Sequence, residues 1–148
     1  MPLTIGVLRE TAPGEKRVAV VPKVWARMQA AGLRVVMEKG AGLAASFADS
    51  DYKDIGLESS PAAVTTTCDA LFCVGPPEIE RIGELKKGAM VMGLLNAYTP
   101  SETTDALRDA GVTAFSMELV PRIARAQSMD VLSSQASVAG YKAVLMAA

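Results

Sequence analysis

The stretch LTIGVL at Leu3–Leu8 decides the fold class, because it is the first of five short apolar runs that recur along the chain. The later runs are Leu33–Glu38, Ala70–Val74, Ala89–Leu94 and Val112–Ser116. Short apolar strands that alternate with helical segments are typical of a parallel sheet covered on both faces. The sequence therefore predicts an α/β fold with a mostly parallel, doubly wound sheet, flavodoxin-like or Rossmann-like, with helices on both faces.

The segments between these runs carry helix signals. Proline in a first turn and glycine after a last turn mark two of the helices strongly. The predicted helices are Lys23–Ala30, a helix that opens at Pro100-Ser101-Glu102 and ends near Gly111, and two weaker patterns at Ser50–Ile55 and Pro61–Thr67. Together with the strands they describe one compact domain.

Composition narrows the classes of partner. Half of the 148 residues are hydrophobic, so the chain can bury a sizeable core. Its 15 basic residues nearly balance its 16 acidic ones, which excludes the electrostatic footprint of a nucleic-acid-binding protein. No apolar stretch approaches the roughly 20 residues needed to span a bilayer. We expect a soluble chain without direct membrane insertion, whose partners are small molecules or proteins.

The reactive side chains are few. The chain has no histidine, which removes the commonest general acid or base and the commonest metal ligand, and two cysteines alone make no zinc site. Without a secretory signal, Cys68 and Cys73 are predicted to be free thiols in a reducing cytoplasm. Cys73 ends a predicted strand, where a reactive thiol is conceivable, but a plain buried or edge cysteine is the favoured interpretation.

Gly40-Ala41-Gly42 is the only candidate for a phosphate-binding loop. A dinucleotide fingerprint should continue to a third glycine and open directly into a helix, and this stretch does not, so a simple turn is favoured. Asp49, Asp51 and Asp54 cluster in the segment that follows. We interpret them as solvated acids in the first turn of a short helix.

Arg17 precedes the apolar run at residues 18–21 and should lie near the end of the sheet. Its guanidinium is suited either to clamp a carboxylate or to brace a neighbouring loop. The sequence favours neither role over the other.

Pro121–Ser137, reading PRIARAQSMDVLSSQAS, is unusually rich in hydrogen-bonding side chains and contains no lysine. Planar donors, amides and hydroxyls suit directional contacts with a polar small molecule. The alternative is that Asp130 and Ser133 only cap a helix, and that Arg122 and Arg125 are exposed charges. Because all of these groups occur in one segment, we favour a ligand-binding role.

A long helix is predicted from about Val131 to Ala148. Small residues repeat on it at three- and four-residue spacings, at Ala136, Ala139, Gly140, Ala143 and Ala147. Such a narrow face allows close packing of another helix. We expect residues 1–130 to form an N-terminal α/β subdomain and residues 131–148 to link it to a further domain beyond this chain.

Several motifs carry a family resemblance over nearly the whole chain. GVLRE, EKRVAVVP, EKGAGLAASFAD and DYKDIG resemble the alanine dehydrogenase and pyridine nucleotide transhydrogenase family. The tail VPRIARAQSMDVLSSQASVAGYKAV is similar to the NAD(H)-binding alpha subunits of the NAD(P) transhydrogenase branch. Gly75 and Asn96 stand where alanine dehydrogenases carry a substrate lysine and a catalytic histidine. The transhydrogenase branch, which passes a hydride directly between two nicotinamides, fits better.

The resemblance implies roles for individual residues. Arg122 would reach the nicotinamide end of NAD(H), and Asp130 and Ser133 would bond near its carboxamide. Gln127 would bridge toward NADP(H) on the partner and is the one residue expected to act in catalysis, while Arg125 lies in the same loop. The carboxamide needs both a donor and an acceptor, which Asp130 and the Ser133 hydroxyl supply.

The resemblance also implies a setting. It predicts a missing C-terminal Rossmann domain, membrane and NADP(H)-binding transhydrogenase subunits as partners, a homodimer, and a cytoplasmic position at the inner face of the membrane. The enzyme would be the assembly, and the 148-residue chain alone would be inactive and bind NAD(H) weakly or not at all. Two alternatives stay open: an alanine dehydrogenase-like oxidoreductase domain, and a non-catalytic flavodoxin-like interaction module.

Overall fold

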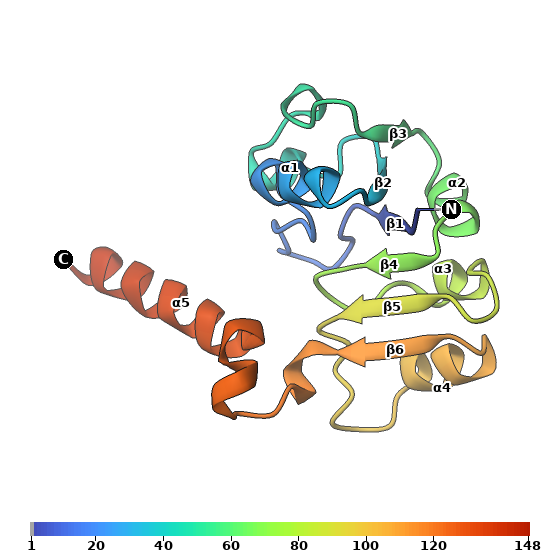
Figure 1. Ribbon diagram of the computed structural model, residues 1–148. Helices are drawn as coiled ribbons and strands as arrows, with labels where there is room; N and C mark the ends of the chain where they lie inside the picture. Colours follow the sequence, from blue (N-terminus) through green and yellow to red (C-terminus); the bar gives the residue numbers. More distant parts are fainter. Residues whose placement is uncertain (1) are drawn as a thin grey trace.

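The computed structural model describes residues 2–148, which form an all-parallel, six-stranded sheet of order β3-β2-β1-β4-β5-β6 (Figure 1). Its strands are β1 (Thr4–Val7), β2 (Arg34–Glu38), β3 (Gly56–Glu58), β4 (Ala70–Phe72), β5 (Met90–Gly93) and β6 (Thr113–Ser116). The order reverses between β1 and β4, as in doubly wound dinucleotide-binding sheets and unlike the flavodoxin order. The predicted fold class is confirmed in its Rossmann-like form.

The helices are α1 (Pro22–Ala30), α2 (Pro61–Thr67), α3 (Ile79–Gly83), α4 (Glu102–Asp109) and α5 (Val131–Ala147). Proline occupies the first turn of α1 and α2, as the sequence predicts. At the start of α4, the Ser101 Oγ accepts from the Thr104 N–H at 3.3 Å, and the Thr104 Oγ1 accepts from the Ser101 N–H at 2.9 Å. This reciprocal cap fixes where α4 begins.

Side chains alternate across the strands and build a core on each face of the sheet. The core under α1 joins Trp25 to residues of β1 and β2, namely Ile5, Val7, Val35 and Met37. The opposite core joins Leu71 of β4 and Val91 of β5 to Ile82 of α3 and Leu107 of α4. Helices therefore cover both faces, and the carboxyl ends of all six strands open toward one edge.

The predicted helix at Ser50–Ile55 is wrong. The chain instead forms a 3₁₀ turn at Asp49–Asp51 and then enters β3 at Gly56. The Asp51 carboxylate accepts from the Ala48 N–H at 2.7 Å and the Asp49 carboxylate from the Gly40 N–H at 2.9 Å. These acids satisfy local backbone donors and favour a turn over a continuing helix.

The last helix extends away from the carboxyl edge of the sheet (Figure 1). α5 begins at Val131, as predicted, and none of its residues is buried. Among residues 2–148, no helix has both the length and the apolar character needed to cross a membrane.

Candidate functional site

The Pro121–Ser137 segment follows β6 at the carboxyl edge of the sheet, where doubly wound proteins bind ligands. After β6 the chain makes a 3₁₀ turn at Met117–Leu119, and a second one at Ala124–Met129 leads into α5. Such irregular backbone leaves polar side chains free to point in several directions. The predicted site thus lies on a connection between the sheet and α5.

A hollow of about 290 Å³ lies within this segment, and we call it the Arg122 hollow. It is lined by Pro121, Arg122, Ile123, Ala124, Gln127 and Asp130. A guanidinium, a primary amide and a carboxylate therefore line one small space. Together these groups can both donate hydrogen bonds to a polar small molecule and accept them from it.

Asp130 caps α5 from the edge of the Arg122 hollow. Its Oδ1 accepts from the Ser133 N–H at 2.9 Å, and its Oδ2 accepts from the Ser133 Oγ at 2.6 Å. The Ser133 hydrogen bonds lower the pKa of Asp130 below its ordinary value of 3.8, and the charge of Arg122 adds to this effect. The structure thus joins Ser133 to the hollow through Asp130, whereas Arg125 is exposed and does not line it.

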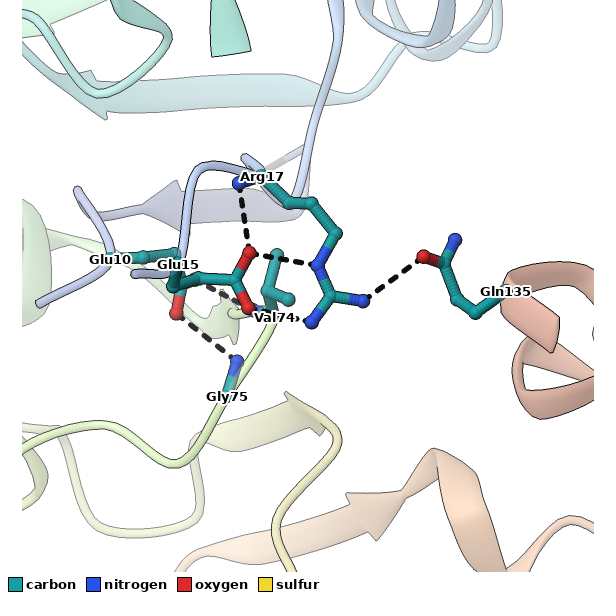
Figure 2. A network of polar contacts seen from close by, with 6 residues as sticks. All are labelled: Glu10, Glu15, Arg17, Val74, Gly75 and Gln135. Atoms are coloured by element: carbon teal, nitrogen blue, oxygen red, sulfur yellow. Dashed lines mark hydrogen bonds and ion pairs between the residues drawn. The ribbon is translucent and has the colours of Figure 1, made fainter. Parts of the chain in front are cut away.

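Arg17 contacts both a carboxylate and α5 (Figure 2). Its Nε donates to the Glu15 Oε1 at 2.8 Å, its Nη2 donates to the Glu15 Oε2 at 2.6 Å, and its Nη1 donates to the Gln135 Oε1 at 3.2 Å. The side-chain hydrogen bonds with Arg17 lower the pKa of Glu15 to about 2. The same bonds raise the pKa of Arg17.

Glu10 holds the loop after β4. Its Oε1 accepts from the Val74 N–H at 2.6 Å and its Oε2 from the Gly75 N–H at 3.1 Å (Figure 2). The paired backbone donors at this point, where the strand order reverses, are therefore used within the chain. Sequence reasoning missed Glu10, Glu15 and Gln135, because nothing local marks which distant group each one contacts.

The cysteines are free and lie in environments that suppress reactivity. Burial, with the negative charge of Glu10 as the smaller cause, raises the pKa of Cys73 to about 12. Burial also raises the pKa of Cys68 to about 11. Because the thiolate is the reactive form, the structure supports the plain buried or edge interpretation of both residues.

The Gly40–Gly42 stretch is a packed turn. Gly40 has φ +76°, which favours glycine, and its N–H is already bonded to Asp49. A Cβ at Gly42 would lie 2.8 Å from the Tyr52 hydroxyl and 2.9 Å from the Phe47 carbonyl oxygen. The loop thus presents no open cradle for a phosphate, as the turn interpretation predicts. Within residues 2–148, no group of acidic or cysteine side chains is placed to hold a metal ion.

Asn96 and Gly75, at which the sequence predicts a departure from alanine dehydrogenases, lie in the loops after β5 and β4. Asn96 has φ +56° in the loop after β5, a conformation that asparagine tolerates better than most residues. The Glu118 carboxylate braces this loop by accepting from the Leu95 N–H at 3.2 Å and the Ala97 N–H at 2.8 Å. Neither Gly75 nor Asn96 supplies a cationic side chain to the carboxyl edge.

Comparison with known proteins decides the family. Residues 6–139 match the family described as alanine dehydrogenase/PNT, N-terminal domain. The chain belongs to this family. Within the alanine dehydrogenase/PNT family, it is 38% identical over 150 residues to the first part of the NAD(P) transhydrogenase subunit alpha of Rhodospirillum rubrum, covering 97% of the chain and 39% of the relative. The predicted resemblance is confirmed.

A transhydrogenase structure and an alanine dehydrogenase sequence show to which of the two kinds of protein the chain is more similar. A crystal structure of transhydrogenase from Sinorhizobium meliloti superposes with a TM-score of 0.89 at 39% identity, over 96% of this chain and 43% of that one. Alanine dehydrogenase 1 of Staphylococcus aureus is 26% identical over 146 residues, covering 99% of this chain and 38% of the relative. The chain therefore spans about two fifths of the length of these relatives and is more similar to the transhydrogenases.

Proposed function

We propose that the chain is the N-terminal part of a proton-translocating NAD(P) transhydrogenase alpha subunit, which helps orient NAD(H) for direct hydride transfer to or from NADP(H) on a partner subunit. The observation that carries this proposal is the meeting of Arg122, Gln127 and Asp130 in one hollow. The greater similarity to a transhydrogenase subunit than to an alanine dehydrogenase supports the choice of branch.

Each polar group has a proposed role in binding. NAD(H) supplies the hydride chemistry. Asp130 and the Ser133 hydroxyl orient the carboxamide, since both oxygens keep lone pairs that accept from its N–H groups, and the Ser133 hydroxyl can donate to the carboxamide oxygen when it leaves Asp130. Arg122 binds at the nicotinamide end. Gln127 points an amide toward the second nucleotide, with Arg125 in the same loop, so the chain contributes alignment, which hydride transfer between two rings requires.

The chain lacks the groups that a dehydrogenase of this family would use. Glycine at position 75 and asparagine at position 96 supply neither an ammonium group to hold a carboxylate nor an imidazole to donate a proton. We therefore expect no pyruvate-dependent oxidation of NADH by the assembled protein. A fall in NADH absorbance on adding pyruvate and ammonium would instead support the alanine dehydrogenase-like alternative.

The proposal includes the rest of the assembly. Residues 1–130 form the first subdomain, and the helix at 131–148 leads toward a Rossmann domain that holds most of the NAD(H). A homodimer of such subunits works with membrane and NADP(H)-binding subunits at the inner, cytoplasmic face of the membrane. The family match favours this assembly over a non-catalytic interaction module.

Gln127→Asn in the assembled transhydrogenase tests the bridging role. The substitution shortens the side chain by one methylene, so we expect hydride transfer to a bound NADP(H) analogue to slow about 10- to 100-fold. NADH binding, measured by fluorescence titration, should change much less. Gln29→Asn, at an exposed position of α1, is the matched control and should alter neither the rate of hydride transfer nor NADH binding. Equal losses in binding and rate at Gln127 would argue against bridging.

A further inference from the structure

The loop from Glu10 to Arg17 connects two regions of the fold that are distant in sequence (Figure 2). At its start, Glu10 is bonded to the backbone of Val74 and Gly75 after β4. At its end, Arg17 is bonded to Gln135 on α5, across 118 residues of sequence. The loop therefore spans from the carboxyl edge of the sheet to the helix that leaves it.

Glu15 orients the Arg17 guanidinium for its hydrogen bond to Gln135. Two guanidinium nitrogens face the two Glu15 carboxylate oxygens, and the Arg17 backbone N–H also donates to the Glu15 Oε1 at 2.9 Å. A bidentate pair of this kind fixes the plane of the guanidinium as well as its position. The remaining nitrogen, Nη1, is directed at the Gln135 amide oxygen.

Beyond its first turn, where Val131 and Leu132 are half-buried and the helix contacts the turn at Met117–Leu119, few other interactions orient α5. The helix contains no buried residue, and its cap at Asp130 and Ser133 is a bond within its own first turn. A local cap stabilises a helix but does not orient it against the sheet. A single long-range hydrogen bond consequently has more influence on α5 than it would on a buried helix.

We propose that Arg17 is a positioning residue, which holds the first turns of α5 against the sheet through Gln135 and thereby orients the Arg122 hollow. The same geometry decides between the two roles suggested by its sequence. The carboxylate that Arg17 binds is that of Glu15 in the same chain, so the positive charge of Arg17 is already compensated. The guanidinium therefore acts as a brace for the neighbouring helix, α5. The effect of this brace on hydride transfer rests on the proposed function, whereas the brace itself does not.

A distance measurement on the 148-residue chain tests the brace directly. Spin labels at Gln29→Cys on α1 and Ser137→Cys on α5, in chains diluted with unlabelled chain so that only distances within one chain are read, report the helix orientation by pulsed electron paramagnetic resonance. The native thiols should stay unlabelled near neutral pH, because burial raises the pKa of Cys68 to about 11 and that of Cys73 to about 12. Treating the wild-type chain, which has no added cysteines, with the same spin label checks that Cys68 and Cys73 are not labelled.

Gln135→Met removes the acceptor while keeping a side chain of similar length. Loss of one hydrogen bond should raise the ratio of released to braced helix about fivefold, seen as a broader distance distribution. Arg17→Met removes the donor of the same hydrogen bond and should broaden the distance distribution equally. Gln135→Glu keeps an oxygen acceptor and should retain the narrow distribution. Lys142→Met, an exposed change on the same helix, is the control.

An unchanged distribution in Gln135→Met, or equal broadening in Lys142→Met, would overturn the proposal. Circular dichroism of each variant establishes that α5 is still helical.

The assembled transhydrogenase supplies the second readout. Gln135→Met should slow hydride transfer by up to about fivefold with little change in NADH affinity, and Gln135→Glu should restore the rate. Broadened distances with an unchanged rate would exclude a role of the brace in hydride transfer. If the wild-type assembly catalysed no transhydrogenation, the proposed function would be overturned. The distance measurement would still show whether Arg17 braces α5.

Discussion

Asp130 combines a structural and a proposed binding role in one carboxylate. Both of its oxygens accept hydrogen bonds from Ser133 at the first turn of α5. A negative charge at this position also interacts favourably with the helix dipole. The carboxylate nevertheless lines the Arg122 hollow, so capping does not remove it from the reach of a ligand.

Asp130→Ser separates the two roles, because serine is also a good helix cap but carries no charge. We expect circular dichroism to show α5 retained, while NADH binding by the complete subunit weakens. Asp130→Ala should lose both properties. If Asp130→Ser bound NADH as tightly as the wild type, the residue would be a cap alone.

Acid titration should reveal the same cap. The folded-state pKa of Asp130 is lowered, so its stabilising contribution is present above the unfolded value and is lost as pH falls through the folded pKa. Helicity attributable to this cap should be constant from neutral pH down to the ordinary value of 3.8 and should decline below it. Asp130→Ser should lack that acid step.

At the scale of elements, Glu118 joins the connections that follow β5 and β6. Its carboxylate bonds the backbone of Leu95 and Ala97, and the Tyr98 hydroxyl donates to the Glu118 carbonyl oxygen at 2.7 Å. Asn96 lies between the two bonded residues with its positive φ. The carboxylate therefore stabilises an otherwise unfavourable loop conformation.

Glu118→Ala should destabilise the chain by about 2 kcal/mol, because two backbone donors lose their acceptor in a mostly buried place. Urea unfolding followed by circular dichroism measures this change. Glu118→Gln should cost less, since its amide keeps one acceptor oxygen. Glu78→Ala, at an exposed glutamate, should leave the free energy of unfolding nearly unchanged, and an equal loss there would contradict the argument.

Element length also explains which elements of the fold could be predicted. The five apolar runs all became strands; β1, β2, β4 and β5 each include buried positions, whereas β6 has none. β3 has three residues, none of them buried, and so lacks an apolar run, while the five residues of α3 are too few to show helical periodicity. The Asp-rich segment before β3 was misassigned because its acids bond nearby backbone donors, a choice that depends on how the chain turns.

At the scale of the whole molecule, α5 carries an exposed apolar surface that is suited to bind another helix. Its exposed large hydrophobic residues are Val138, Tyr141, Val144, Leu145 and Met146. Its small residues, including Ala139 and Ala143, leave room for another helix to approach. An exposed apolar surface of this kind is typical of an interaction site. We expect it to pack on a second copy or on another region of the subunit.

The proposed homodimer gives a direct prediction for the isolated chain. Sedimentation should show a concentration-dependent dimer, and Val144→Asp should shift it toward the monomer by placing a charge in the apolar surface. Val24→Asp, at an exposed valine of α1, is the matched control and should not shift the equilibrium. A monomer at every concentration would contradict dimer formation through α5.

The sequence by itself determined the parallel α/β architecture, the start of α5 and the polar segment before it, because periodicity, proline and capping signals act over a few residues. The family resemblance in its motifs predicts Arg122, Asp130 and Ser133 at the nicotinamide end of NAD(H) and Gln127 as a bridge toward NADP(H). Only the tertiary structure showed that Arg125 lies outside the hollow and that Arg17 contacts Gln135 of α5. Those contacts depend on folding, which brings together groups as much as 118 residues apart.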